Sequence, residues 1–279
     1  MAFPVIYPKH LQEQMKIAGS AKAIMCGYCG NENYSDSDLW VCSHCENPNQ
    51  ASLITISLND PVLMGAIAST NKLLQQNYVR GALAEYEKVT KNYADPGFIY
   101  YYALLHIQAS NYEVSQIRYD RKGFMEENAT HRSAASDFAS KARRLLFKTA
   151  VVCQKNMAED QKNPLLPFVL FMASVKLGNL RTAKRAVEQL SQLESPLLLK
   201  YADMLYNMEL GKYDIAASRA LEMTKKGFMS INAFYYISLA LLKVGRIDMA
   251  QTLLGAYGKY VQNNSVNALA GAIAAEEKV

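Results

Sequence analysis

The feature that most constrains this chain is a cluster of four cysteines near its start, in the stretch CGYCGNENYSDSDLWVCSHC. Cys26, Cys29, Cys42 and Cys45 have the spacing C-x2-C-x12-C-x2-C, and a fifth cysteine lies far along the chain at position 153. Each C-x2-C turn lets two thiolates converge on one ion, so two turns predict the tetrahedral four-sulfur site that Zn(II) prefers. Because four sulfur ligands leave no position for water, we expect this zinc to be structural rather than catalytic.

The segment around these cysteines resembles a zinc ribbon, which has two metal-binding knuckles next to short strands. The residues between the cysteine pairs are polar and typical of turns, and the following LWVC is typical of a strand. A metal would supply the folding free energy that so short a segment lacks. We expect Trp40, with Tyr28 or Tyr34, to pack on the knuckles, and the alternative is an exposed aromatic contact for a partner.

Other interpretations of the cysteines remain open. Two disulfides would need an oxidising compartment, whereas the first residues show no secretory signal and predict a cytoplasmic protein. A rubredoxin-type iron site also uses two C-x2-C pairs, but these are usually much farther apart in sequence. His44 lies inside the second knuckle and could be a ligand, although we expect it to face solvent because four cysteines are available.

The uneven charge of the chain bears on the kind of partner. The formal net charge is +5, yet residues 1–60 carry three Lys or Arg against six Asp or Glu. From Met25 to Gln50 there is no Lys or Arg. Because phosphate contacts dominate nucleic-acid affinity and need cations, we expect this acidic ribbon to contact protein rather than nucleic acid.

The rest of the chain is predicted to be helical and repetitive. The segments LGNLRTA, LGKYDIA and VGRIDMA place Gly178, Gly211 and Gly245 at almost equal intervals along the chain. Each glycine follows an apolar stretch with helical periodicity and is followed by an alanine at the fifth position after it. Fainter copies put Gln76 and Ser110 at the position of the glycine. Helix pairs joined by turns at these positions are therefore expected.

This pattern resembles the tetratricopeptide repeat, a helix pair of about 34 residues with a small residue at the turn. The resemblance covers about residues 62–262 and is incomplete, because Leu190, Met223 and Tyr257 stand where the family has alanine. It implies a mostly α protein, an α-solenoid of stacked helix pairs with a concave groove. The alternative is an unrelated helical bundle.

The predicted organisation starts the helical array at Pro61, after Asn59 or Asp60 as helix cap. Near 144 the repeat gives way to one longer, basic helix. The C-terminal residues are rich in alanine and predict a capping helix, or a short helix offered to a partner. The predicted parts are an N-terminal segment (1–22), the zinc ribbon (23–54), the helical array (61–262) with a long-helix insertion near 115–163, and the C-terminal capping helix (263–279).

No catalytic motif is found, and no phosphate-binding glycine loop, H-E-x-x-H or G-x-S-x-G occurs. His106 lies in an apolar stretch and is expected to be a satisfied core histidine rather than a general base. Cys153 is expected to be a small buried hydrophobe, with a reactive thiol as the alternative. A basic segment is expected to be a solvated face, or to dock an acidic partner or nucleic acid, through Arg118, Arg121, Lys122, Arg132, Lys141, Arg143, Arg144 and Lys148.

Two functions follow as expectations. The first is a non-enzymatic adaptor or scaffold subunit of a multiprotein assembly, which binds a protein partner through the groove and the acidic ribbon. The alternative is a nucleic-acid- or ribosome-associated factor that uses the basic 118–148 face with the ribbon. An enzyme with an unrecognised site is the third possibility. No membrane span is expected, because the longest apolar stretch is interrupted by Pro167 and falls short of about 20 residues.

Overall fold

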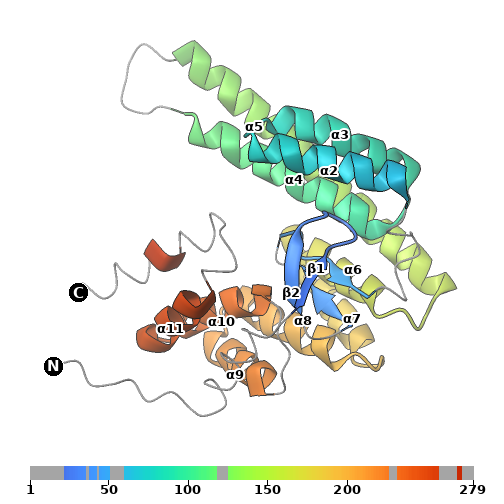
Figure 1. Ribbon diagram of the computed structural model, residues 1–279. Helices are drawn as coiled ribbons and strands as arrows, with labels where there is room; N and C mark the ends of the chain where they lie inside the picture. The colour runs from blue at the N-terminus through green and yellow to red at the C-terminus, as the bar shows by residue number, and fades with distance from the viewer. Residues whose placement is uncertain are drawn as a thin grey trace.

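The computed structural model describes residues 22–35, 38–42, 44–50, 60–117, 125–225, 231–257 and 269–271 (Figure 1). Within these residues the chain is mostly helical, with two small antiparallel sheets at its N-terminal end. The predicted segment 1–22 lies almost entirely outside the described residues, as do the basic residues Arg118, Arg121 and Lys122. Most of the predicted helix 263–279 lies outside them as well.

The two sheets are copies of one hairpin. In the first, β1 (Lys22–Met25) pairs with β2 (Glu32–Ser35); in the second, β3 (Trp40–Val41) pairs with β4 (Pro48–Asn49). Each pair of strands flanks one C-x2-C turn. The register is also repeated, since Trp40 pairs with Asn49 in the second hairpin as Ile24 pairs with Asn33 in the first.

Consecutive helices pack against one another, and none of the described helices is long and apolar enough to cross a membrane. The first begins where the sequence predicts, because Asp60 Oδ1 accepts hydrogen bonds from the backbone N–H groups of Val62 (2.9 Å) and Leu63 (3.1 Å). The helices are α2 (Pro61–Gln75), α3 (Val79–Asn92), α4 (Pro96–Ser115), α5 (Met125–Glu159), α6 (Leu165–Lys176), α7 (Leu180–Leu190), α8 (Pro196–Glu209), α9 (Tyr213–Lys225), α10 (Ile231–Lys243) and α11 (Ile247–Tyr257).

The turns predicted at three glycines are confirmed. Gly178, Gly211 and Gly245 follow α6, α8 and α10 with φ of 70°, 70° and 72°, the left-handed region that glycine adopts without steric cost. The matching alanines, in the second helix of each pair, are fully buried. Small side chains there let the two helices of a pair approach closely.

Two fainter copies of the repeat were placed wrongly. The left-handed residue after α2 is Asn77 (φ 57°) rather than Gln76, and asparagine is the residue that best tolerates this region after glycine. No turn occurs at Ser110, because α4 continues to Ser115. The extra turn is held by Glu113, which accepts a hydrogen bond from Arg80 of α3 (3.0 Å) and pairs with His131 of α5 (2.6 Å).

The long helix expected in the insertion is α5, with 35 residues and a length of about 52 Å. It packs on α4 and on α6, so it joins the two parts of the helical array (Figure 1). Of the basic residues described on it, Lys141 is half-buried, whereas Arg143, Arg144 and Lys148 are exposed. Arg132 is exposed as well.

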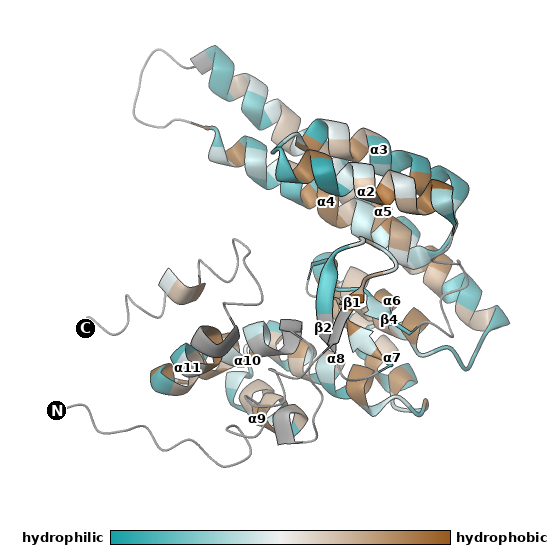
Figure 2. Cartoon of the chain, in the orientation of Figure 1, coloured by the Kyte–Doolittle hydropathy of each residue, from teal (hydrophilic) through white to brown (hydrophobic). Residues whose placement is uncertain are grey.

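The apolar core has two parts. One contains the cysteine-rich hairpins and helices α2, α3 and α4; the other runs from α4 to α11 and includes Val41 of β3. Figure 2 shows hydrophobic and hydrophilic residues alternating along α3 and α5. On α3, Leu83, Tyr86 and Val89 recur at every third position and are buried. The hairpins lie between α4 and the group α6 to α8 (Figure 1).

Candidate metal centre

The four cysteines come together in one buried cluster. All four Sγ atoms lie within 4.8 Å of one another, and each cysteine is at most 1% exposed. Two of the separations join the two knuckles, with Cys26 Sγ 3.6 Å from Cys45 Sγ and Cys29 Sγ 3.5 Å from Cys42 Sγ. A disulfide would bring two sulfur atoms to about 2.0 Å, so no disulfide joins these cysteines.

These separations fit a tetrahedral zinc ion. With Zn–S bonds of about 2.3 Å, a regular tetrahedron places its sulfur atoms about 3.8 Å apart. The observed distances of 3.5 and 3.6 Å, with none above 4.8 Å, bracket that value. The four side chains therefore form a possible metal site whose ligand set and spacing are consistent with zinc.

The two knuckles share a turn hydrogen bond and a left-handed residue at matching positions. In the first, the N–H of Gly30 donates to the Cys26 carbonyl (2.9 Å); in the second, the N–H of Glu46 donates to the Cys42 carbonyl (3.0 Å). The residue after each second cysteine is left-handed, with φ of 65° at Gly30 and 58° at Glu46. The left-handed residue turns the chain back, so each knuckle presents both of its thiols to the same point.

Backbone and amide N–H groups point at the sulfur atoms. The N–H of Tyr28 lies 3.4 Å from Cys26 Sγ, and the N–H of His44 lies 3.3 Å from Cys42 Sγ. Asn33 Nδ2 donates to Cys42 Sγ at 3.5 Å, and Asn47 Nδ2 donates to Cys45 Sγ at 3.5 Å. Donors of this kind stabilise thiolates and orient metal ligands.

The thiols do not lose their protons equally easily. Burial opposes ionisation of Cys26, but hydrogen bonds with the other three thiols outweigh it and lower its pKa well below the usual value. Burial raises the pKa values of Cys29 and Cys45 well above the usual range, and their contacts with Cys26 add to this. One thiolate is thus stabilised by the neighbouring thiols. Four thiolates in one buried cluster would repel one another unless a cation neutralised them, and a bound metal ion supplies that charge as the thiols lose their protons.

The first knuckle is docked tightly on the helices. Tyr28, 3% exposed, packs edge-on against Phe98 with ring centroids 5.0 Å apart, and its carbonyl accepts a hydrogen bond from Tyr86 (2.6 Å). Asn71 of α2 donates to the Cys29 carbonyl at 2.8 Å. A Cβ at Gly97 of α4 would lie 2.3 Å from the Tyr28 ring, so only glycine permits this approach.

The second knuckle reaches three helices through Glu46. Its carboxylate accepts hydrogen bonds from Tyr100 of α4 (2.9 Å) and Tyr236 of α10 (3.1 Å), and it forms an ion pair with Lys176 of α6 (3.1 Å). Burial raises the pKa of Glu46, but the Lys176 charge and these hydrogen bonds outweigh it and lower the pKa below its usual value. Asn47 also donates to the Gly97 carbonyl, at 3.0 Å. The four-cysteine cluster is thus linked directly to α4, α6 and α10.

The other predicted residues lie apart from the cluster. His44 is exposed, as expected, and Trp40 is buried at 4% exposure, so it packs inside as Tyr28 does. Cys153 is buried on α5, and burial raises its pKa, which is unfavourable for a reactive thiol. The side chain of Tyr34 is outside the described residues.

His106 is a core residue, but it is not satisfied. It is 7% exposed, and neither ring nitrogen finds a hydrogen-bond partner among the described residues. Burial, with a smaller contribution from Lys141, lowers the pKa of His106 to about 4. The ring packs edge-on against Tyr102 with ring centroids 4.7 Å apart. The lowered pKa favours the neutral ring at physiological pH, which suits this aromatic packing.

Sequence reasoning missed two features, and only the first of them was visible in the sequence. The stretches CGYCGNEN (26–33) and CSHCENPN (42–49) share the pattern C-x2-C-x-N-x-N, and the matched asparagines support the two hairpins alike. Nothing in the sequence near Glu46 indicates that it binds the helices, because its partners lie 54, 130 and 190 residues away.

No protein-family model and no curated protein matches this chain.

Proposed function

We propose that the chain is a non-catalytic adaptor or scaffold subunit of a multiprotein assembly, built as a helical-repeat array that a zinc ribbon braces from within. The observation that carries this proposal is the position of Glu46, next to ligand Cys45 and bonded to α4, α6 and α10. A closed four-sulfur zinc at such a position stabilises structure and offers no site for a substrate.

A tetratricopeptide-like solenoid is the architecture that best accounts for the helices. Glycine turns at almost equal intervals support it, as do buried alanines in each second helix. The first helices of successive pairs also contact one another, α4 with α6, α6 with α8 and α8 with α10. In a solenoid these first helices line the concave face, and stacking of the pairs buries a continuous core.

The proposed role of the ribbon changes in this architecture. Its contacts through Glu46 and Asn47 are with first helices, so the ribbon would occupy part of the concave face rather than extend from the array. A partner would bind to the part of the groove that remains and to the exposed rim of the ribbon, which includes Glu32, Asp38 and His44. This rim keeps the acidic character that favours a protein partner.

The alternative, a nucleic-acid-associated factor, has one supporting feature in the exposed cations of α5. The ribbon contributes little to it, because Trp40 and Tyr28, the aromatic side chains that could stack on bases, are 4% and 3% exposed. The adaptor role is therefore the stronger proposal.

The test is affinity capture from native lysate with the zinc-loaded full chain, in parallel with and without nuclease, followed by partner identification. The adaptor role predicts the same protein partners in both arms. Partners that disappear after nuclease treatment would contradict it and favour the nucleic-acid role.

A further inference from the structure

The outer face of α5 carries apolar side chains among cations. Phe147 is 65% exposed and Val151 is 48% exposed, one helical turn further along the same face. The stretch between Asp137 and Glu159 contains no Asp or Glu. Four exposed cations surround the apolar pair, and no ion pair engages them within the described part of the chain: Arg143, Arg144, Lys148 and Lys155.

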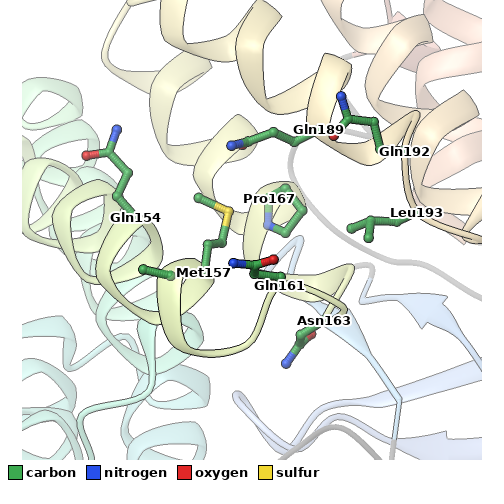
Figure 3. A pocket seen from close by; sticks show the side chains of 9 residues that line it. Gln154, Met157, Gln161, Asn163, Pro167, Gln189, Gln192 and Leu193 are labelled. Atoms are coloured by element: carbon green, nitrogen blue, oxygen red, sulfur yellow. The ribbon is translucent and has the colours of Figure 1, made fainter.

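This face leads into a pocket of about 500 Å³ at the end of α5 (Figure 3). Gln154 and Ala158, which continue the row of Phe147 and Val151 along the helix, belong to its lining. The other lining residues come from the end of α5, the α5–α6 connection, α6, and the end of α7 with the residues after it: Met157, Gln161, Asn163, Pro167, Gln189, Gln192 and Leu193.

The lining is rich in amides and lacks charge. Among the described residues, no hydrogen bond engages the side chains of Gln154, Gln161 or Gln189, whereas Asn163 accepts one from the N–H of Leu165 (3.0 Å). A glutamine amide offers both donors and an acceptor, the same groups that a peptide backbone presents. The pocket therefore fits an uncharged stretch of polypeptide better than a phosphate or a carboxylate.

We propose that the α5 surface, defined as Arg143 to Ala158 with the adjoining pocket, binds an acidic amphipathic segment of a partner protein. Apolar side chains of the segment would cover Phe147 and Val151, its carboxylates would pair with the surrounding cations, and one uncharged end would enter the pocket. An apolar centre inside a charged rim is the usual anatomy of a protein interface. The inference rests on the proposed adaptor role and names the chemistry of one partner.

The dimensions suit such a segment. From Arg143 to Ala158 the helix is about 22 Å long, enough for about four turns of a partner helix laid along it. A nucleic acid would use the cations but gains little from Val151 or from a pocket without positive charge.

The experiment selects peptides of about 16 residues, the length of this part of α5, from a random phage-displayed library on the zinc-loaded full chain. Selection is repeated on the Arg144→Glu/Phe147→Glu variant and on a control, Val62→Glu/Lys72→Glu, which changes an equally exposed pair on α2 (Val62 is 68% exposed). Circular dichroism checks that each variant is folded.

The proposal predicts enrichment of acidic peptides with apolar residues at every third or fourth position on the wild type and the control. Synthetic copies should bind the Arg144→Glu/Phe147→Glu variant at least tenfold more weakly, and a smaller loss is expected for Gln161→Ala/Gln189→Ala. Equal affinity for wild type and the α5 variant would overturn the proposal. So would selection of peptides without net negative charge, or tighter and equally α5-dependent binding of a single-stranded RNA of random sequence.

Failure of this inference can be told from failure of the adaptor role. If the α5 variant still captures the same lysate proteins as the wild type, the adaptor role stands and the proposed binding at the α5 surface is wrong. If neither captures nuclease-resistant partners, the adaptor role itself fails.

Discussion

The two knuckles of the metal site make the same turn and dock by opposite means. At the left-handed position, the first knuckle has Gly30 and the second has Glu46. A Cβ at Gly30 would lie 2.5 Å from Ile67 Cγ2, so the first knuckle packs on α2 by having no side chain there. The second knuckle extends a carboxylate to α4, α6 and α10.

The difference shows how a duplicated turn acquires two structural roles through one residue in each copy. A non-glycine residue in the left-handed region costs about 1 kcal/mol. Glu46 occupies it nonetheless, and side chains held at a backbone cost are found where they do something that a less strained residue cannot. Here the turn directs the carboxylate between helices that are far apart in sequence.

Loss of the metal should destabilise the protein most, because both knuckles depend on it. Cys42→Ser takes away one of four ligands, and we expect loss of the bound zinc and of about 5 kcal/mol of stability, seen as a melting temperature lower by about 10 °C or more. Elemental analysis and thermal denaturation measure this. The matched control is Cys153→Ser, also a buried cysteine, which should keep full zinc content. Equal zinc loss in the two variants would contradict the assignment.

The next effect is confined to the first knuckle. Gly30→Ala combines left-handed strain with the overlap on Ile67, and we expect it to reduce the free energy of unfolding by about 3 kcal/mol. Ile67→Ala removes the overlapping Cγ2, so the double variant should lose about 1–2 kcal/mol less than the sum of the single changes. Urea denaturation of the three variants gives the coupling, and additive losses would rule out the close contact.

A smaller effect is expected at the second knuckle. Glu46→Gly keeps the turn and relieves its strain but leaves Lys176 and two tyrosines without their partner, for a net loss of about 2 kcal/mol. Glu46→Gln keeps neutral hydrogen bonds and should lose about 1 kcal/mol, since the ion pair is partly exposed (17% for Glu46 and 31% for Lys176). Both variants should retain one zinc per chain, and zinc loss would show that Glu46 supports the metal rather than the helices.

The smallest expected difference is in zinc affinity, between variants of the matched asparagines Asn33 and Asn49. Asn33→Ala removes a donor to Cys42 Sγ, whereas Asn49→Ala removes an acceptor for the Gly27 N–H (3.1 Å). We expect zinc affinity to fall about tenfold in the first variant and less in the second, although both lose about 1 kcal/mol of stability. Competition with a chromophoric chelator measures affinity, and equal losses would remove the distinction.

Local chemistry explains what the sequence could predict. The spacing of the four cysteines suffices to predict their cluster, because a C-x2-C turn has few ways to present two thiols. The turns at Gly178, Gly211 and Gly245 could be predicted because a left-handed helix end favours glycine. The prediction failed at Ser110, where a similar local pattern is overridden by packing of α4 on α3 and α5.

Docking of the ribbon could not be predicted, because it depends on pairs that are distant in the chain. Nothing near Glu46 indicates that Tyr236, 190 residues later, will donate to it. Gly97 gives no local sign that the Tyr28 ring will cover it. The ribbon was expected to contact a partner protein through its acidic surface, whereas its knuckles share a core with α2, α3 and α4 of the same chain.

Hydrogen–deuterium exchange of the full chain, with zinc and after chelation, shows whether the metal site braces the helices. We expect zinc removal to accelerate amide exchange in the ribbon and also in α4, α6 and α10, around Tyr100, Lys176 and Tyr236. Acceleration confined to residues 22–50, with α6 and α10 unchanged, would contradict it.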